Sequence, residues 1–259
     1  MVSSSAFKNK LIKRLTITVT LLFAIVASGY MTFNRASFYC MLAEVMYMHK
    51  IGDNVYISPG SNDAQIELCR ELVATAKSRN TKLWGSVQSR PVFIFCTDWD
   101  DYYNFGMYRT QAMTRMNFAG EYIVISPFGM NSDDVSHEMC HAELYSRVGY
   151  KNDKKIPLWF HEGLAMILCK EYPQSYTDYL TEWNNMTKST PEMLPLDRIS
   201  SDEDFYSSPS RSNLAYWRSG MEVTRWFEIS GRKGLVKMMN HLNDGWDFYT
   251  AYKKAEEIY

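Results

Sequence analysis

The sequence has no excess of charge of either sign and no closely spaced cysteine pair. Its 259 residues carry 28 basic and 29 acidic side chains, for a net charge of −1. This balance argues against a nucleic-acid partner, which a strongly basic chain would suggest. The five cysteines include no C-x-x-C pair, so a cysteine-ligated metal is disfavoured. No spacing forces a disulfide, and Cys140 and Cys169 are expected to be free buried thiols.

Histidine is also scarce, and three of the five histidines fall in two short segments. The first segment is HEMCH at 137–141, and the second is WFHEGLA at 159–165. Neither proline nor glycine interrupts residues 135–148, which predicts a helix with Asp133 or Asp134 as its N-cap. On a helix, His137 and His141 project from the same face. Glu138 then lies beside a metal held by this pair, where its carboxylate can take a proton from water.

A catalytic zinc ion takes three protein ligands, so a third ligand must come from elsewhere in the chain. Glu162 is the best candidate, because it lies in a second apolar-patterned segment at 156–168. A turn around 149–153 would let this segment pack against the first. His161 competes for the same position, but it points about 100° away from Glu162 on a helix, so only one of the two can face the metal.

The two segments together resemble the gluzincin clan of metallopeptidases. WFHEGLA is similar to the W-[LF]-x-E-G-[FL]-A signature of the aminopeptidase branch and of its peptidase MA-like relatives. The twenty residues between His141 and Glu162 are close to the spacing of that branch. The resemblance implies one Zn²⁺ per chain held by His137, His141 and Glu162, and peptide hydrolysis with Glu138 as the general base. The metzincin pattern does not fit, because Leu144 and Arg147 stand where it needs Gly and His.

The resemblance extends to two further places and fails at a third. Tyr216-Trp217-Arg218 resembles the Y-x-K sequence of the aminopeptidase branch, which implies that the Tyr216 phenol stabilises the oxyanion, although Ser219 replaces the following glycine. The strand expected at 121–126 would be the sheet edge that binds extended peptide, with an internal strand as the alternative. The G-x-M-E-N motif that grips a free N-terminus has no match at 120–122, so the choice between endopeptidase and exopeptidase stays open.

The N-terminus predicts a membrane anchor. Residues 15–33 contain no charge, and a helix of this length spans roughly 28 Å, about the hydrocarbon thickness of a bilayer. Basic residues precede the span, which places the N-terminus in the cytoplasm and the remaining chain outside. A cleavable signal peptide, with small residues at 24–29, is the alternative and would give a secreted protein. An intramembrane protease is disfavoured, because charged side chains flank the metal segment. The basic residues of the N-terminus are Lys8, Lys10, Lys13 and Arg14.

These patterns predict an α+β chain with a zincin-like, thermolysin-like catalytic domain behind one transmembrane helix. Small strands are expected at 54–58, 92–96 and 121–126, and helices at 36–50, 63–79, 135–148, 156–168, 215–228, 235–242 and 248–255. Residues 173–213 are expected to form loops with short helices. The predicted boundaries are a cytoplasmic segment 1–14, an anchor 15–33, a juxtamembrane segment 34–52 and a catalytic domain 53–259, in which 53–172 holds the sheet and the metal helices and 173–259 is helical.

The predicted function is zinc-dependent hydrolysis of peptide bonds outside the cytoplasm, with a peptide or protein as substrate. Two other classes remain. A membrane-tethered scaffold could keep the zincin fold and bind zinc without turnover, or a zinc hydrolase could act on a different amide or ester. The sequence leaves the oligomeric state open.

Overall fold

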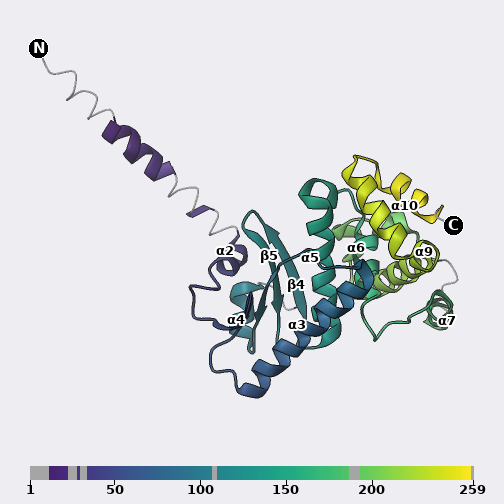
Figure 1. Cartoon of the computed structure of the whole chain (residues 1–259), viewed down its shortest axis with the longest axis horizontal. Coiled ribbons are helices and arrows are strands. Elements are labelled where there is room, and N and C mark those ends of the chain that lie inside the picture. The colour runs from purple at the N-terminus through teal and green to yellow at the C-terminus, as the bar shows by residue number, and fades with distance from the viewer. Residues whose placement is uncertain (1–11, 23–27, 30–33, 107–109, 187–192, 258–259) are drawn as a thin grey trace, which may run out of the picture.

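The structure is a computed structural model that describes residues 12–22, 28–29, 34–106, 110–186 and 193–257. A five-stranded mixed sheet, in the order β1-β2-β3-β5-β4, forms one part of the molecule, and a group of helices forms the other (Figure 1). The pairs β2/β3 and β3/β5 are parallel, and the two outer pairs are antiparallel. The strands are β1 His49–Gly52, β2 Val55–Ile57, β3 Val92–Phe95, β4 Ala112–Asn117 and β5 Gly120–Ile125.

Both faces of the sheet are covered by helices. Side chains of a strand alternate between faces, so Phe93 and Phe95 pack with α3 and α5 while Ile94 packs with α2 and α4. Asn62 caps α3 in a reciprocal capping box with Gln65, and Gly85 ends it in a left-handed conformation. The helices around the sheet are α2 Arg35–Met41, α3 Asp63–Trp84, α4 Trp99–Phe105 and α5 Ser132–Asp153.

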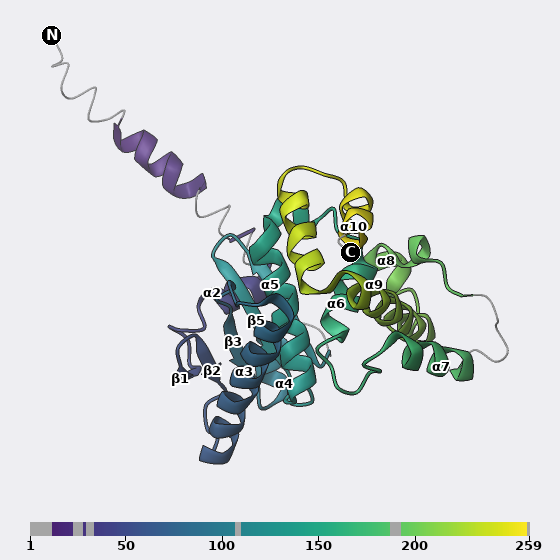
Figure 2. The same ribbon diagram turned by 45° about the vertical axis from the view of Figure 1, so that its right-hand side comes forward.

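The helical part packs around α6 and the long helix α9. Figure 2 shows α5 between the sheet and these helices. Trp159 and Phe160 of α6 contact Trp226 of α9 and Phe248 and Tyr252 of α10 in an aromatic core. The elements are α6 Leu158–Met166, α7 Tyr176–Met186, the 3-10 helix η1 Leu196–Ile199, α8 Asp202–Phe205, α9 Pro209–Asn243 and α10 Phe248–Glu256.

Two glycines break long helices where the sequence indicated an end. Gly149 has φ 69° inside α5, and Gly231 has φ 56° inside α9. Residues with a side chain rarely adopt this left-handed conformation, so each glycine lets the chain change direction within a run of helix. The break at Gly149 sets the turn that leads from the histidine helix to α6.

The N-terminal residues 12–22 form a helix that projects from the remaining structure, with its side chains exposed (Figures 1 and 2). Within the described residues, no helix has both the length and the apolar character to cross a bilayer. The predicted span 15–33 includes 23–27 and 30–33, which lie outside the described residues.

The predicted α+β class, with a small mixed sheet and a helical C-terminal part, is confirmed. One predicted helix is wrong in part, one strand was missed, and the position of a third element in the sheet is decided. The helix expected at 36–50 ends at Met41, and residues 49–52 instead pair with β2 as a strand. The strand β4 was not predicted, because its six residues are all half-buried and show no alternation. The strand β5 is internal, between β3 and β4, which is the alternative left open for residues 121–126, and β4 is the strand at this edge of the sheet.

Candidate metal centre

The helix α5 places its two histidines on one face. Asn131 is the N-cap, since its side-chain oxygen accepts from the backbone N–H groups of Asp133 and Asp134 at 3.0 and 2.9 Å. The predicted cap at Asp133 or Asp134 is therefore wrong by two or three positions. Four residues after His137, the ring of His141 lies with its centroid 4.8 Å from that of His137. This is the i, i+4 arrangement that the sequence predicted.

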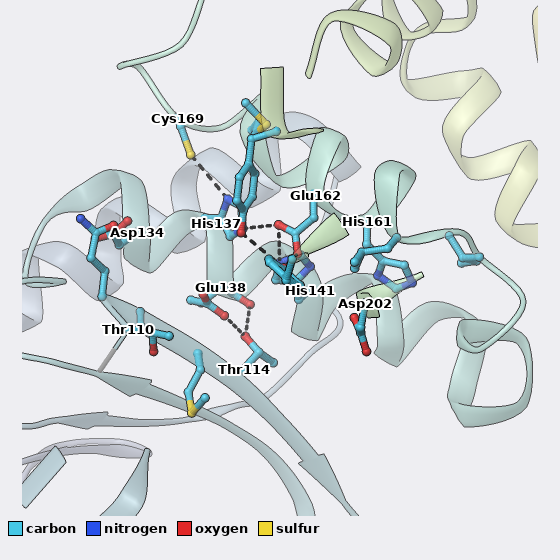
Figure 3. A pocket seen from close by; sticks show the side chains of 18 of the residues that line it. Thr110, Thr114, Asp134, His137, Glu138, His141, His161, Glu162, Cys169 and Asp202 are labelled. Carbon is cyan, nitrogen blue, oxygen red and sulfur yellow. Dashed lines mark hydrogen bonds and ion pairs between the residues drawn. The ribbon is translucent and has the colours of Figure 1, made fainter. Parts of the chain in front are cut away.

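Glu162 of α6 completes a group of three ligands. Its Oε2 lies 3.1 Å from Nε2 of His137 and 3.7 Å from Nε2 of His141 (Figure 3). The ligand atoms of all three residues lie within 4.8 Å of one another. Zinc bonds of 2.0–2.1 Å in a tetrahedron separate neighbouring ligand atoms by about 3.3 Å. The spacing and the donor set therefore fit one divalent ion.

His161, the competing ligand, faces elsewhere. Its Nε2 lies 3.4 Å from the backbone oxygen and 3.7 Å from the carboxylate of Asp153. Its ring centroid is 6.2 Å from that of His141. The helix geometry predicted that only one of the neighbours His161 and Glu162 could face the metal, and the structure brings Glu162 to the pair.

Close packing of α6 against α9 holds Glu162 in place. A Cβ atom added at the next residue, Gly163, would lie 2.4 Å from the backbone oxygen of Ser219 and 2.5 Å from a methyl group of Val223. Only glycine permits this approach of the two helices. The Glu162 side chain consequently extends from a buried helix that packs closely against α9.

Two of the three candidate ligands have the protonation state that metal binding requires. Burial by itself raises the pKa of Glu162, but His141 and the hydrogen bond with His137 lower this pKa to about 2. Burial lowers the pKa of His141 to about 4. Burial also acts to lower the pKa of His137, but Cys169 and Glu162 raise it well above its ordinary value. At neutral pH Glu162 is thus a carboxylate and His141 is neutral, and a metal ion bound here would displace one proton from His137.

Glu138 lies beside the ligands and is held by the edge strand. The Thr114 hydroxyl lies 2.7 Å from Glu138 Oε2 and 2.7 Å from the Glu138 backbone oxygen (Figure 3). Burial raises the pKa of Glu138 above its ordinary value. A more basic carboxylate is better matched to accepting a proton near neutral pH.

Two tyrosine side chains lie close to Glu162. The Tyr206 hydroxyl donates to Oε1 of Glu162 at 2.9 Å, and its oxygen lies 3.4 Å from that of Tyr216. The sequence indicated Tyr216 as a site residue but carried no signal for Tyr206. Tyr206 follows α8 in the region where the apolar periodicity fades, and no motif marks it. Its role arises from the contact with a residue 44 positions away.

The centre opens into a cavity of about 890 Å³. The edge strand β4 forms one wall through Ala112, Met113 and Thr114, and α5 and α6 form another. Tyr206 and Tyr216 also line it. A cavity of this size accommodates several residues of an extended chain or a compact small molecule.

The cysteines do not form part of the trio. All five are free and buried, as predicted for Cys140 and Cys169.

Comparison with protein-family models and with curated proteins finds no match to this chain. The gluzincin resemblance therefore rests on the motif and on the trio formed by the half-buried His137 and His141 and the buried Glu162.

Proposed function

We propose that the protein is a zinc-dependent metallopeptidase. The observation that carries the proposal is the convergence of two imidazoles and one distant carboxylate within 4.8 Å, at the wall of a cavity. Two histidines and one glutamate are a known ligand set of catalytic zinc, with the fourth position left to water or substrate. Calcium and magnesium prefer sites made of oxygen atoms alone, so the two imidazoles favour zinc.

The chain's own residues supply the remaining chemistry. When bound, the ion is a Lewis acid that makes water more acidic and polarises a carbonyl oxygen. Glu138 takes the proton from the attacking water and passes it to the leaving nitrogen. Thr114 holds the Glu138 carboxylate toward the cavity. The Tyr216 hydroxyl donates a hydrogen bond to the oxyanion that develops from the substrate carbonyl.

The position of β4 supports a peptide substrate. It is the last strand of the sheet, and its residues line the cavity beside Glu138. The outward backbone groups of an edge strand are available for pairing, so an extended peptide can add to it through main-chain hydrogen bonds. The scissile bond would then lie over the trio of ligands.

The test compares Glu138→Gln with Glu67→Gln, a change at an exposed glutamate of α3. Glu138→Gln should retain bound zinc and lose about 10²- to 10⁴-fold in hydrolysis, the usual contribution of a general base. Glu67→Gln should match the wild type. A peptide-library digest with and without chelator measures both. Zinc binding without cleavage of any peptide would instead support the scaffold or a hydrolase for another amide or ester.

We also propose that the N-terminal segment anchors the protein in a membrane with the catalytic part outside the cytoplasm. The hydroxyls of Thr16, Thr18 and Thr20 donate to the backbone oxygens four residues earlier at 3.0, 3.0 and 2.9 Å. These bonds satisfy polar groups that would otherwise be costly in lipid.

Carbonate extraction of membranes from cells expressing the full chain tests the anchor. The full chain should stay with the membranes, whereas a version starting at residue 34 should be released. N-terminal sequencing of the product distinguishes the anchor from the cleaved signal peptide, and a free product lacking the first residues would refute anchoring.

A further inference from the structure

Nδ1 of His137 faces a sulfur atom. Nε2 of this ring points at Glu162, and the opposite nitrogen, Nδ1, lies 3.8 Å from Sγ of Cys169 (Figure 3). Among the residues that the structure describes, Cys169 is the one that places a hydrogen-bonding atom, Sγ, next to Nδ1 of His137. A histidine that binds a metal through Nε2 carries its proton on Nδ1 and donates it to a neighbouring acceptor.

The sulfur of Cys169 is placed to accept a hydrogen bond from the Nδ1–H group of His137. Sγ lies 3.6 Å from the backbone oxygen of Ala165 and 3.7 Å from that of Asp133. The thiol hydrogen can therefore be donated to either of these oxygens, which leaves the sulfur lone pairs directed to His137. A short chain results, from the imidazole N–H to the sulfur and from the S–H to a carbonyl oxygen.

The backbone around Cys169 is fixed on both sides. Arg79 of α3 donates to the backbone oxygen of Leu168 at 2.8 Å and to the Asp133 carboxylate at 2.6 Å. The same carboxylate accepts from the backbone N–H of Glu171 at 3.0 Å. These bonds tie the segment that carries the sulfur to the first turn of α5, the helix that carries His137. The sulfur and the imidazole are thus held at a set separation.

We infer that Cys169 is a positioning residue that holds His137 with Nε2 directed at the metal. The inference rests on the proposed zinc site. Outer partners of this kind are usually carboxylates or carbonyl oxygens, and their removal costs about 10- to 100-fold in metal affinity. The sulfur fixes both the tautomer and the ring orientation of His137. Cys169 takes no part in the reaction and does not itself bind the ion.

The experiment measures the zinc affinity of the full chain by competition with a chromophoric chelator. Cys169→Ala should lose about 10- to 100-fold in affinity. Cys169→Ser keeps an acceptor and a donor and should bind zinc within a few-fold of the wild type. Cys69→Ala is the matched control, because Cys69 is a buried thiol in a core cluster that excludes the metal ligands, and its affinity should equal the wild type's.

The outcomes separate the two proposals. Equal affinity of Cys169→Ala and wild type would overturn the inference alone, as would a serine variant that loses as much as the alanine variant. If Cys169→Ala does not fold, Cys169→Val replaces it: the valine fills the space without an acceptor and should lose affinity that serine retains. A wild-type chain that binds no zinc would overturn the proposed function and this inference together.

Discussion

Replacing Tyr206 by Phe should weaken zinc binding while leaving the fold intact. The substitution removes the hydroxyl that donates to Oε1 of Glu162 at 2.9 Å. The ring remains, so its contacts with Phe205 and Tyr216, at centroid distances of 5.0 and 6.4 Å, are retained. Glu162 would keep its charge but lose a partner that fixes the direction of its carboxylate. The Tyr206→Phe substitution should therefore lower the affinity for the metal.

The magnitude follows from the kind of bond and its exposure. A hydrogen bond to a charged group contributes about 1.5–3 kcal/mol. Tyr206 is 47% exposed, so water competes for its hydroxyl and the lower value applies. About 1.5 kcal/mol corresponds to roughly a tenfold rise in the zinc dissociation constant. Chelator competition resolves a change of this size, and the melting temperature of the protein reports on the fold.

Tyr216→Phe is the control, because its hydroxyl is 3.4 Å from that of Tyr206 and has no bond to Glu162. It should bind zinc like the wild type and lose about 10²-fold in kcat, the cost of removing an oxyanion donor. For Tyr206→Phe at saturating zinc, kcat should change little. Equal zinc affinity of wild type and Tyr206→Phe, or equal losses in both variants, would refute the assignment of separate roles to the two phenols.

Three further predictions concern the edge strand, the helix packing and the acid stability. Thr114→Val removes the hydroxyl that holds Glu138, so kcat/KM in a peptide assay should fall about tenfold with zinc affinity unchanged; unaltered kcat/KM would contradict this. Gly163→Ala forces α6 away from α9 and should destabilise the protein by about 1–3 kcal/mol in urea unfolding. Burial acts to raise the pKa of Glu222, but Arg225 and Arg218 hold it below its ordinary value. The stabilising contribution of the Glu222 carboxylate is therefore present above the unfolded-state pKa and is lost as pH falls through the folded-state pKa. Glu222→Gln should reduce the loss of melting temperature on acidification. An unchanged dependence of melting temperature on pH would count against the pairing of Glu222 with the two arginines.

Local signals in the sequence predicted much of the site. The uninterrupted run from 135 to 148 indicated the helix, and its period placed His137 and His141 on one face. The choice of Glu162 over His161 came from the second motif and from the rule that neighbours on a helix point apart. Each of these predictions depends on residues close together in the chain, where backbone geometry alone decides the outcome.

Predictions that depended on pairing or capping partners were less successful. The strand β4 pairs along its length with β5 but has no alternating pattern, so its existence and its place at the edge came only from the fold. Asn131, rather than Asp133, caps α5, and the Asp133 carboxylate instead pairs with Arg79 from α3. Sequence patterns carry no record of such partners, which lie far away in the chain.

The sequence by itself determined which side chains could hold a metal ion, since the kinds of ligand and their spacing on one helix are local properties. Only the tertiary structure decided which groups support those ligands and the neighbouring Glu138. Tyr206 reaches Glu162, Cys169 reaches His137 and Thr114 reaches Glu138 across separations of 44, 32 and 24 residues. The physical reason is that hydrogen bonds between side chains act over about 3–4 Å, so they form only after packing of the sheet and helices has brought distant segments together.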